Sequence, residues 1–270
     1  MSCSGLIEML VRRHMEKQKV IGVIVARKHS RRIKGKNLRL LGYSIGKPEP
    51  LVCWTFKCAR QAESLDRIVV STDDPKVRDL ALEYKIEVPF FPRPPELSVD
   101  CDTALVLQHV VEFLEEKEDY HPSHVVLLQS TSPFRYPEDI NHCVEIAKKT
   151  GCDTCLSVRK VTEFPQWMFR PMTTDSDIRL EPYLGVDLVG DVLVSQTLPK
   201  LWFPSGAVYV TKTEFIRKGR IFGKDIRGYE MPPERSIDIE NETDFHVAEV
   251  ILEERAKKKF EKSWTKERSE

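Results

Sequence analysis

A run of positive charge follows the first long apolar stretch of the chain. The sequence "VARKHSRRIKGKN", residues 25–37, holds six Lys and Arg side chains in thirteen positions, with one glycine and no acidic residue. Guanidinium and ammonium groups in such a run can neutralise phosphate oxygens. The run contains neither G-x-x-x-x-G-K-[ST] nor G-x-G-x-x-G, the loops of ordinary nucleotide and dinucleotide sites. It is a candidate phosphate site of another kind, with a solvated basic loop as the alternative.

Two acidic residues near the other end of the chain are candidate ligands for a cation. Asp238-Ile239-Glu240 places two carboxylates two residues apart, and on a strand such side chains project from the same face. Carboxylate oxygens suit a hard cation such as Mg²⁺. A half-exposed strand is the alternative, but the basic run elsewhere in the chain favours a metal site, because phosphoryl chemistry needs both.

Buried strands are needed to position these groups. Continuous β-branched runs predict strands at residues 20–26, 67–72, 124–129, 154–158 and 206–211, and helical patterns occupy residues 50–63, 74–85, 102–119 and 137–150. The alternation predicts an α/β fold of the Rossmann-like, doubly wound type, with a mainly parallel sheet and helices on both sides. Ligands of such sheets bind beyond the carboxyl ends of the strands, where the basic run lies.

Composition excludes several classes of protein. Lys plus Arg and Asp plus Glu both number 42 in the 270 residues, so the overall charge favours neither a nucleic-acid nor a membrane partner. The chain shows no signal peptide and no apolar stretch of membrane-spanning length. Seven cysteines, an odd number scattered through apolar segments, indicate a reduced, cytoplasmic protein. Cys152 and Cys155 are interpreted as two buried structural cysteines, with metal or redox chemistry as the alternative.

Six segments, in order and spacing, resemble one enzyme family. The segment "VIVARKHSRRIKGKNLRLLG" looks like the A-R-x-x-S-[KR]-x-x-x-x-K-N signature of the CMP-sialic acid synthetase, or acylneuraminate cytidylyltransferase, family. The other five segments are "VVSTDD", "RPPELSVD", "LLQSTSPFR", "PSGAVYV" and "SIDIENETDFHVAE". Together they span roughly residues 20–252.

The resemblance implies a cytidylyltransferase that transfers CMP from CTP to the anomeric hydroxyl of a nonulosonic, sialic-acid-like 2-keto sugar acid and releases pyrophosphate. It implies Mg²⁺ or Mn²⁺ as cofactor, CTP and a sugar acid as partners, and a homodimer. By the same resemblance Arg27, Lys36 and Asp238 are the catalytic residues, and Asp238 and Glu240 the metal ligands. The implied nucleotide-binding and substrate-binding residues are Ala26, Lys28, Ser30, Arg31, Asn37, Arg93, Ser98, Asp100, Asp102, Gln129 and Ser132.

Two of these roles stay open in the sequence. Gln129 ends a buried strand, where its amide can donate and accept hydrogen bonds toward a polyhydroxylated ligand. The alternative is an ordinary hydrogen-bonding residue at a strand end. The general base is also open, since Asp238 could act on the acceptor hydroxyl directly or through metal-bound water.

The domain organisation follows from the same segments. We expect an N-terminal extension at residues 1–19, a nucleotidyltransferase domain at 20–255 and a charged C-terminal tail at 256–270. Between residues 163 and 204 the pattern breaks into prolines, aromatic residues and short polar pieces. We expect this part to form a lid or dimerisation subregion, with local core as the alternative for its aromatic side chains.

Several positions depart from the family pattern. His29 stands where Gly or Asn is frequent, Glu240 where Asp is common, and Ser195 where an arginine tied to substrate handling precedes Gln196. The missing arginine leaves the acceptor open. The alternatives are a ketodeoxyoctonate-like or phosphonate acceptor, GTP in place of CTP, or a non-catalytic nucleotide-binding protein.

Overall fold

The computed structural model describes residues 18–173, 177–185 and 194–267, with side chains as far as residue 259. Most of the predicted N-terminal extension, two stretches of the predicted lid or dimerisation subregion and the last three residues of the predicted tail lie outside the described residues.

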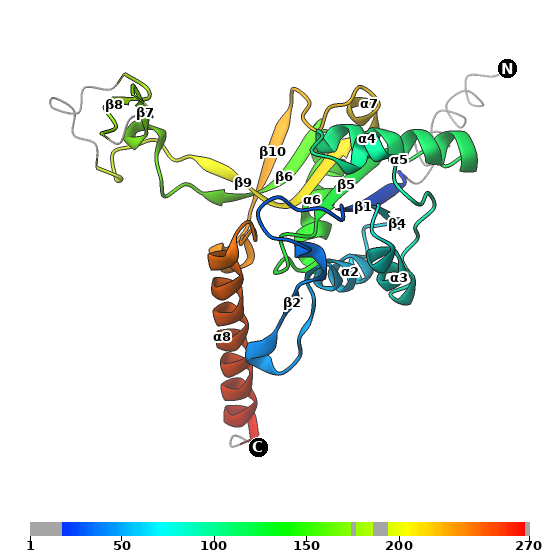
Figure 1. Ribbon diagram of the computed structural model, residues 1–270, viewed down its shortest axis with the longest axis horizontal. Coiled ribbons are helices and arrows are strands. Elements are labelled where there is room, and N and C mark those ends of the chain that lie inside the picture. Colours follow the sequence, from blue (N-terminus) through cyan, green and yellow to red (C-terminus); the bar gives the residue numbers. More distant parts are fainter. Residues whose placement is uncertain (1–17, 174–176, 186–193, 268–270) are drawn as a thin grey trace, which may run out of the picture.

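A six-stranded sheet forms the centre of the molecule (Figure 1). In sheet order its strands are β10 (Ile226–Glu230), β6 (Thr154–Lys160), β9 (Trp202–Lys212), β5 (His124–Gln129), β1 (Val20–Ala26) and β4 (Arg67–Thr72). β1 pairs in parallel with β4 and β5, and β10 pairs in parallel with β6. β9 alone runs antiparallel to its neighbours β5 and β6. The predicted α/β fold with a mainly parallel sheet is confirmed.

Helices cover both faces of the sheet, as predicted. The helices are α2 (Leu51–Gln61), α3 (Pro75–Glu83), α4 (Pro95–Ser98), α5 (Thr103–Glu118), α6 (Pro137–Thr150), α7 (Thr213–Ile216) and α8 (Glu242–Glu267). Alternate residues of β1 enter two separate cores: Val20 and Ile24 pack with α2, α3 and α6, whereas Ile21 and Val23 pack with α5 and α7. Burial of both faces explains why the strand reads as one continuous apolar run.

The predicted break between residues 163 and 204 corresponds to an arm that leaves the sheet. β6 and β9 stay paired as far as Lys160 and Trp202, and beyond them the chain forms a short 3₁₀ helix, η3 (Pro165–Trp167), and a hairpin of β7 (Phe169–Pro171) and β8 (Leu180–Pro182). Figure 1 shows this hairpin far from the sheet. Phe164 is buried against Trp167, whereas Phe169 and Tyr183 are exposed.

The C-terminal part of the chain packs on the segment that follows the basic run. η1 (Lys36–Leu38) ends the basic run, and the segment after it contains β2 (Leu40–Leu41), η2 (Tyr43–Ile45) and β3 (Glu49–Pro50). A further 3₁₀ helix, η4 (Pro233–Arg235), precedes α8. The Glu249 carboxylate of α8 accepts hydrogen bonds from the backbone N–H groups of Gly42, Tyr43 and Ser44 at 2.8–3.1 Å. Burial alone would raise the pKa of Glu249, but these hydrogen bonds lower it below its ordinary value. α8 continues through residue 255 without a break.

The two cysteines of the C-x-x-C motif are buried, as expected from the sequence. Cys152 and Cys155 are both fully buried, and the Cys155 thiol is hydrogen-bonded to that of Cys143 on α6. Among the described helices, none has the length and apolar character needed to cross a bilayer.

His124 at the start of β5 makes the stability of the fold depend on pH. Burial, with Lys148 and Lys212 nearby, lowers its pKa to about 4 from an ordinary 6.5. Because the unfolded chain binds this proton first, stability is complete above pH 6.5 and falls as the pH drops toward 4, by about 3 kcal/mol in total. Urea unfolding at pH 7 and pH 4.5 should show this loss in the wild type and a smaller one in His124→Gln. An equal loss in both proteins would contradict the assignment.

Candidate active site

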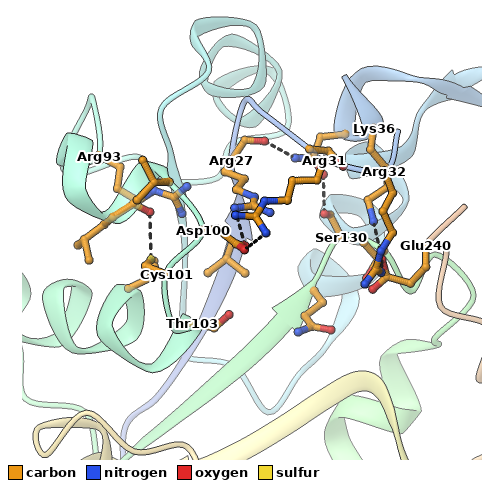
Figure 2. Close-up of a pocket in the computed structure, with 18 residues that line it drawn as sticks. Arg27, Arg31, Arg32, Lys36, Arg93, Asp100, Cys101, Thr103, Ser130 and Glu240 are labelled. Atoms are coloured by element: carbon orange, nitrogen blue, oxygen red, sulfur yellow. Dashed lines mark hydrogen bonds and ion pairs between the residues drawn. The ribbon is translucent and has the colours of Figure 1, made fainter. Parts of the chain in front are cut away.

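A cleft of about 370 Å³ lies beyond the carboxyl ends of β1 and β5 (Figure 2). One wall is the basic run after β1, and the facing wall is the segment from Arg93 to the first turns of α5. The floor comes from the end of β5, and Glu240 closes one side. The cleft therefore occupies the place where parallel α/β sheets bind their ligands.

Most of the residues singled out in the sequence meet in this cleft. Those that line it are Arg27, Ser30, Arg31, Lys36, Asn37, Arg93, Asp100, Gln129 and Glu240. Those that do not line it are Ala26, Lys28, Ser98, Asp102, Ser132 and Asp238. The second group lies close by in the chain, and several of its members hold the first group in position.

The basic run is held by acidic partners on both sides of the cleft. Asp100 lies between Arg27 and Arg31, at 3.1 Å and 2.7 Å from their guanidinium nitrogens, as Figure 2 shows. Lys36 is only 9% exposed, and its Nζ donates to the Ile239 carbonyl at 2.8 Å and lies 3.5 Å from Glu240. Glu240 also pairs with Arg32. The run is thus ordered by charge pairing, although only its last two residues, Lys36 and Asn37, lie in a helix, the short η1.

Asn37 links the basic run to the floor of the cleft. Its Nδ2 donates to the Arg27 carbonyl at 2.9 Å, and its Oδ1 accepts from Ser130 Oγ at 2.6 Å. Gly35, with φ of 65°, adopts the left-handed conformation that turns the chain into η1 just before Asn37. Both polar atoms of the Asn37 amide are therefore engaged with protein, and the residue fixes the position of Arg27.

Arg93 is a buried cation on the opposite wall. It is 3% exposed, and its Nε and Nη2 have no hydrogen-bond partner among the residues that the structure describes. Burial lowers the pKa of its guanidinium, and Asp73, 3.6 Å from Nη2, opposes this. The Asp73 carboxylate also accepts from the Lys28 backbone N–H at 2.8 Å. Buried donors left without partners suit a ligand that brings hydrogen-bond acceptors.

Two backbone-positioning contacts explain why Ser98 and Asp102 lie outside the cleft. Ser98 Oγ donates to the carbonyls of Arg93 and Pro94, at 3.2 Å and 3.0 Å. Asp102 is the N-cap of α5, where its carboxylate accepts from the Ala104 N–H at 2.9 Å. Both residues fix the wall that carries Arg93 and Asp100.

Gln129 and Asp238 converge on Gly206 of β9. A Cβ atom added to Gly206, whose φ is 80°, would lie 3.2 Å from Gln129 Oε1 and 3.4 Å from Asp238 Oδ2. Glycine lets the two side chains approach this strand. Arg135, which is fully buried, supports the same region by donating to the Gln129 and Ala207 carbonyls at 2.8 Å and 2.6 Å.

The segment that carries the two carboxylates is not the strand expected from the sequence. Residues 237–240 are irregular, and the Ile239 N–H donates to the Thr131 carbonyl at 2.8 Å while its side chain is fully buried. The expectation was wrong because the apolar residue between the acids packs into a small core with α8 instead of a sheet face. The two acids still flank one buried residue.

Asp238 and Glu240 fit a divalent cation in their chemistry. Asp238 Oδ1 is buried and has no hydrogen-bond partner in the described part of the chain. Burial raises the pKa of Asp238, a hydrogen bond from Thr131 lowers it, and the nearby Glu240 charge raises it further. Among the described residues, no group of three or more His, Cys, Asp or Glu side chains is placed so that it could hold a metal ion, so the remaining ligands would be phosphate or water oxygens, as is usual for Mg²⁺.

The cleft contains residues that the sequence reasoning missed. They are Val25, Arg32, Leu97, Thr103, Val106, Ser130 and Thr131, whereas Val99 and Cys101, which also line the cleft, lie in the stretch from Ser98 to Asp102 that the sequence indicated. Ser130 and Thr131 directly follow the Gln129 strand end, so the rule that placed Gln129 would have found them. Arg32 belongs to the basic run, but no spacing rule separates it from the solvated Lys34.

Comparisons with known proteins place this chain in a family. Residues 21–172 match the family model described as "Cytidylyltransferase". The chain is 32% identical over 245 residues to "CMP-N,N'-diacetyllegionaminic acid synthase" of Legionella pneumophila, covering 87% of this chain and 97% of that protein. It is 26% identical to an N-acylneuraminate cytidylyltransferase of Escherichia coli and 27% identical to one of Danio rerio. It spans only about half the length of each, 54% and 50%.

Solved structures show the same fold at low identity. A CMP:2-keto-3-deoxy-manno-octonic acid synthetase complexed with CTP aligns with a TM-score of 0.59 at 15% identity, covering 88% of this chain and 99% of that one. A 4-diphosphocytidyl-2C-methyl-D-erythritol synthase aligns with a TM-score of 0.58 at 11% identity, covering 87% and 100%. Taken with the sequence matches, the chain belongs to the cytidylyltransferase family and is a nucleotidyltransferase of its acylneuraminate cytidylyltransferase branch.

Proposed function

We propose that the protein transfers CMP from CTP to the anomeric hydroxyl of a nonulosonic acid, a sialic-acid-like 2-keto sugar acid, and releases pyrophosphate. The observation that carries this proposal is that one cleft joins the basic run to the buried Arg93 on one side and to Gln129 and Glu240 on the other. The similarity to the Legionella protein supports a legionaminic-type acceptor. The soluble reaction partners are CTP and the sugar acid.

In this proposal the basic run and Arg93 bind different parts of the nucleotide. Arg27, Arg31 and Lys36 bind the triphosphate and neutralise the charge that develops on the pyrophosphate leaving group. Arg93 offers its unpaired donors to the acceptor atoms of the base, next to the apolar Leu97 and Val99. Lys28 and Ser132, both outside the cleft, contribute through backbone position, as does Ala26, whose carbonyl accepts from Thr72 Oγ1 at 2.6 Å.

The sugar acid is placed at the Gln129 end of the cleft. The Gln129 amide hydrogen-bonds the sugar hydroxyls, and Asp238, which lies beside Gln129 at Gly206, accepts the proton of the attacking hydroxyl directly or through water. Asp238 and Glu240 would hold Mg²⁺ or Mn²⁺, which when bound supplies charge neutralisation at the phosphate oxygens. Ser195 lies in an exposed turn outside the cleft.

Product identification tests the proposed reaction. The protein is incubated with CTP, Mg²⁺ and one acceptor at a time: N-acetylneuraminic, N,N'-diacetyllegionaminic, pseudaminic or ketodeoxyoctonic acid, or a phosphonate. Mass spectrometry should detect a CMP conjugate of a nonulosonic acid, and GTP should give none. A conjugate formed only with ketodeoxyoctonic acid or the phosphonate, or with GTP, would replace the proposal by that alternative.

Gly206→Ala should impair turnover more than stability. The added methyl group would press on Gln129 and Asp238, and we expect kcat to fall at least about tenfold while the left-handed φ costs about 1 kcal/mol of folding free energy. Gly219→Ala is a matched control, because its φ is 65° and its added Cβ would lie 3.2 Å from Gln108 Oε1, and neither residue lines the cleft. Equal kcat values in the two variants would contradict the placement of the acceptor.

The arm is the surface through which we expect the homodimer to form. It exposes Trp167, Phe169, Leu180, Tyr183, Trp202 and Phe203, and a concentration of exposed large apolar side chains on one part of a protein is typical of interfaces. Sedimentation velocity should show a dimer for the wild type and a monomer for the double variant Phe169→Ser with Tyr183→Ser. Leu82→Ser on α3, an equally exposed site, should stay dimeric. A dimer in all three proteins would place the interface elsewhere.

The cysteines accord with the cytoplasmic location proposed from the sequence. Six cysteines lie in the part of the chain that the structure describes, and none of them forms a disulfide. Reduced cysteines are usual in the cytoplasm.

A further inference from the structure

The carboxylate of Glu240 is paired with two cations of the basic run. Arg32 forms an ion pair with it, and Lys36 Nζ lies 3.5 Å from the same oxygen. Figure 2 shows both side chains converging on Glu240 at one end of the cleft. A carboxylate held in this way is neutralised without any ligand.

The two cations differ in how firmly they are held. Lys36 is almost buried and also donates to the Ile239 carbonyl, so its position is set by the protein. The Arg32 side chain is 66% exposed, and Glu240 is its one partner among the residues that the structure describes. Because an exposed ion pair contributes only about 0.2–1 kcal/mol, Arg32 can leave Glu240 at little cost.

The neighbouring carboxylate differs from Glu240 in its partners. Asp238 Oδ1 is buried without a hydrogen-bond partner in the described part of the chain. A divalent cation bound there would attract Glu240 as a second ligand and would compete with Arg32 for it. Arg32 lines the cleft, so a polyphosphate bound along the basic run would offer its guanidinium new oxygen partners.

We propose that Arg32 is a further binding residue of this site, which occupies Glu240 in the free protein and turns to the phosphate oxygens when a divalent cation takes that carboxylate. The identity of the nucleotide rests on the proposed function, but the competition for Glu240 does not. Metal and nucleotide then bind cooperatively, because each removes the partner that competes with the other.

Arg32→Ala tests the proposal by two affinities that should change in opposite directions. Binding of Mn²⁺ to the nucleotide-free protein, measured by electron paramagnetic resonance, should tighten by a factor of about 1.4 to 5, the range set by an exposed ion pair. Binding of CTP at saturating Mg²⁺ without acceptor, measured by calorimetry, should weaken about tenfold, because a charge-assisted hydrogen bond is lost. If Arg32 had a purely structural role, its loss would not strengthen Mn²⁺ binding while weakening CTP binding.

Two controls separate this competition from a general loss of positive charge. Arg39→Ala removes an arginine that pairs with Glu242 outside the cleft, and it should change neither affinity. In a Glu240→Gln background, Arg32→Ala should leave Mn²⁺ affinity unchanged.

Three results would overturn the proposal: unchanged or weaker Mn²⁺ binding by Arg32→Ala, equal tightening by Arg39→Ala, or tightening that persists in Glu240→Gln. Absence of measurable Mn²⁺ binding in both wild type and Arg32→Ala would overturn it as well. Failure of every acceptor in the product assay, with the Mn²⁺ result as expected, would remove the proposed reaction and leave the role of Arg32 at Glu240 in place.

Discussion

The nearly buried ammonium group of Lys36 is the interaction on which the arrangement of the cleft depends. A charge removed from water needs compensating partners, and Lys36 finds them in the Ile239 carbonyl and the Glu240 carboxylate. These partners lie some two hundred residues away in the chain. The contact therefore fixes the distance between the basic run, where we propose that the triphosphate binds, and the two acidic residues that we propose as cation ligands.

Two other parts of the fold, the sheet and α8, hold the two sides of this contact in position. The sheet presents the ends of β1 and β5 side by side, so that Asn37 and Ser130 can hydrogen-bond across them. On the other side, Glu249 of α8 accepts a hydrogen bond from the segment after the basic run. α8 also packs in a small apolar core that includes Ile33 and Ile239. The elements that carry the charged residues of the cleft are thus anchored in three separate hydrophobic cores.

The sequence predicted the elements best where burial was complete on both faces. β1, β4 and β5 have the predicted bounds to the residue, because polar residues flank each run on both sides. The same runs could not reveal that β9 is antiparallel, since a strand covered on both faces looks alike in either direction. β10 was not predicted because most of its residues are exposed.

Within the cleft, side-chain type indicated the cations, but only the tertiary structure distinguishes buried Lys36 and Arg93 from exposed Lys34.

The most direct test of the central claim compares two lysines of the basic run by CTP titration. Lys36 lines the cleft, whereas Lys34 is exposed and lies outside it, so the two alanine variants lose the same charge from the same segment. Calorimetry with Mg²⁺ and CTP should show affinity reduced at least about tenfold in Lys36→Ala and nearly unchanged in Lys34→Ala, with both proteins folded by circular dichroism. Equal affinities in the two variants would contradict the account, because the triphosphate would then not bind against Lys36.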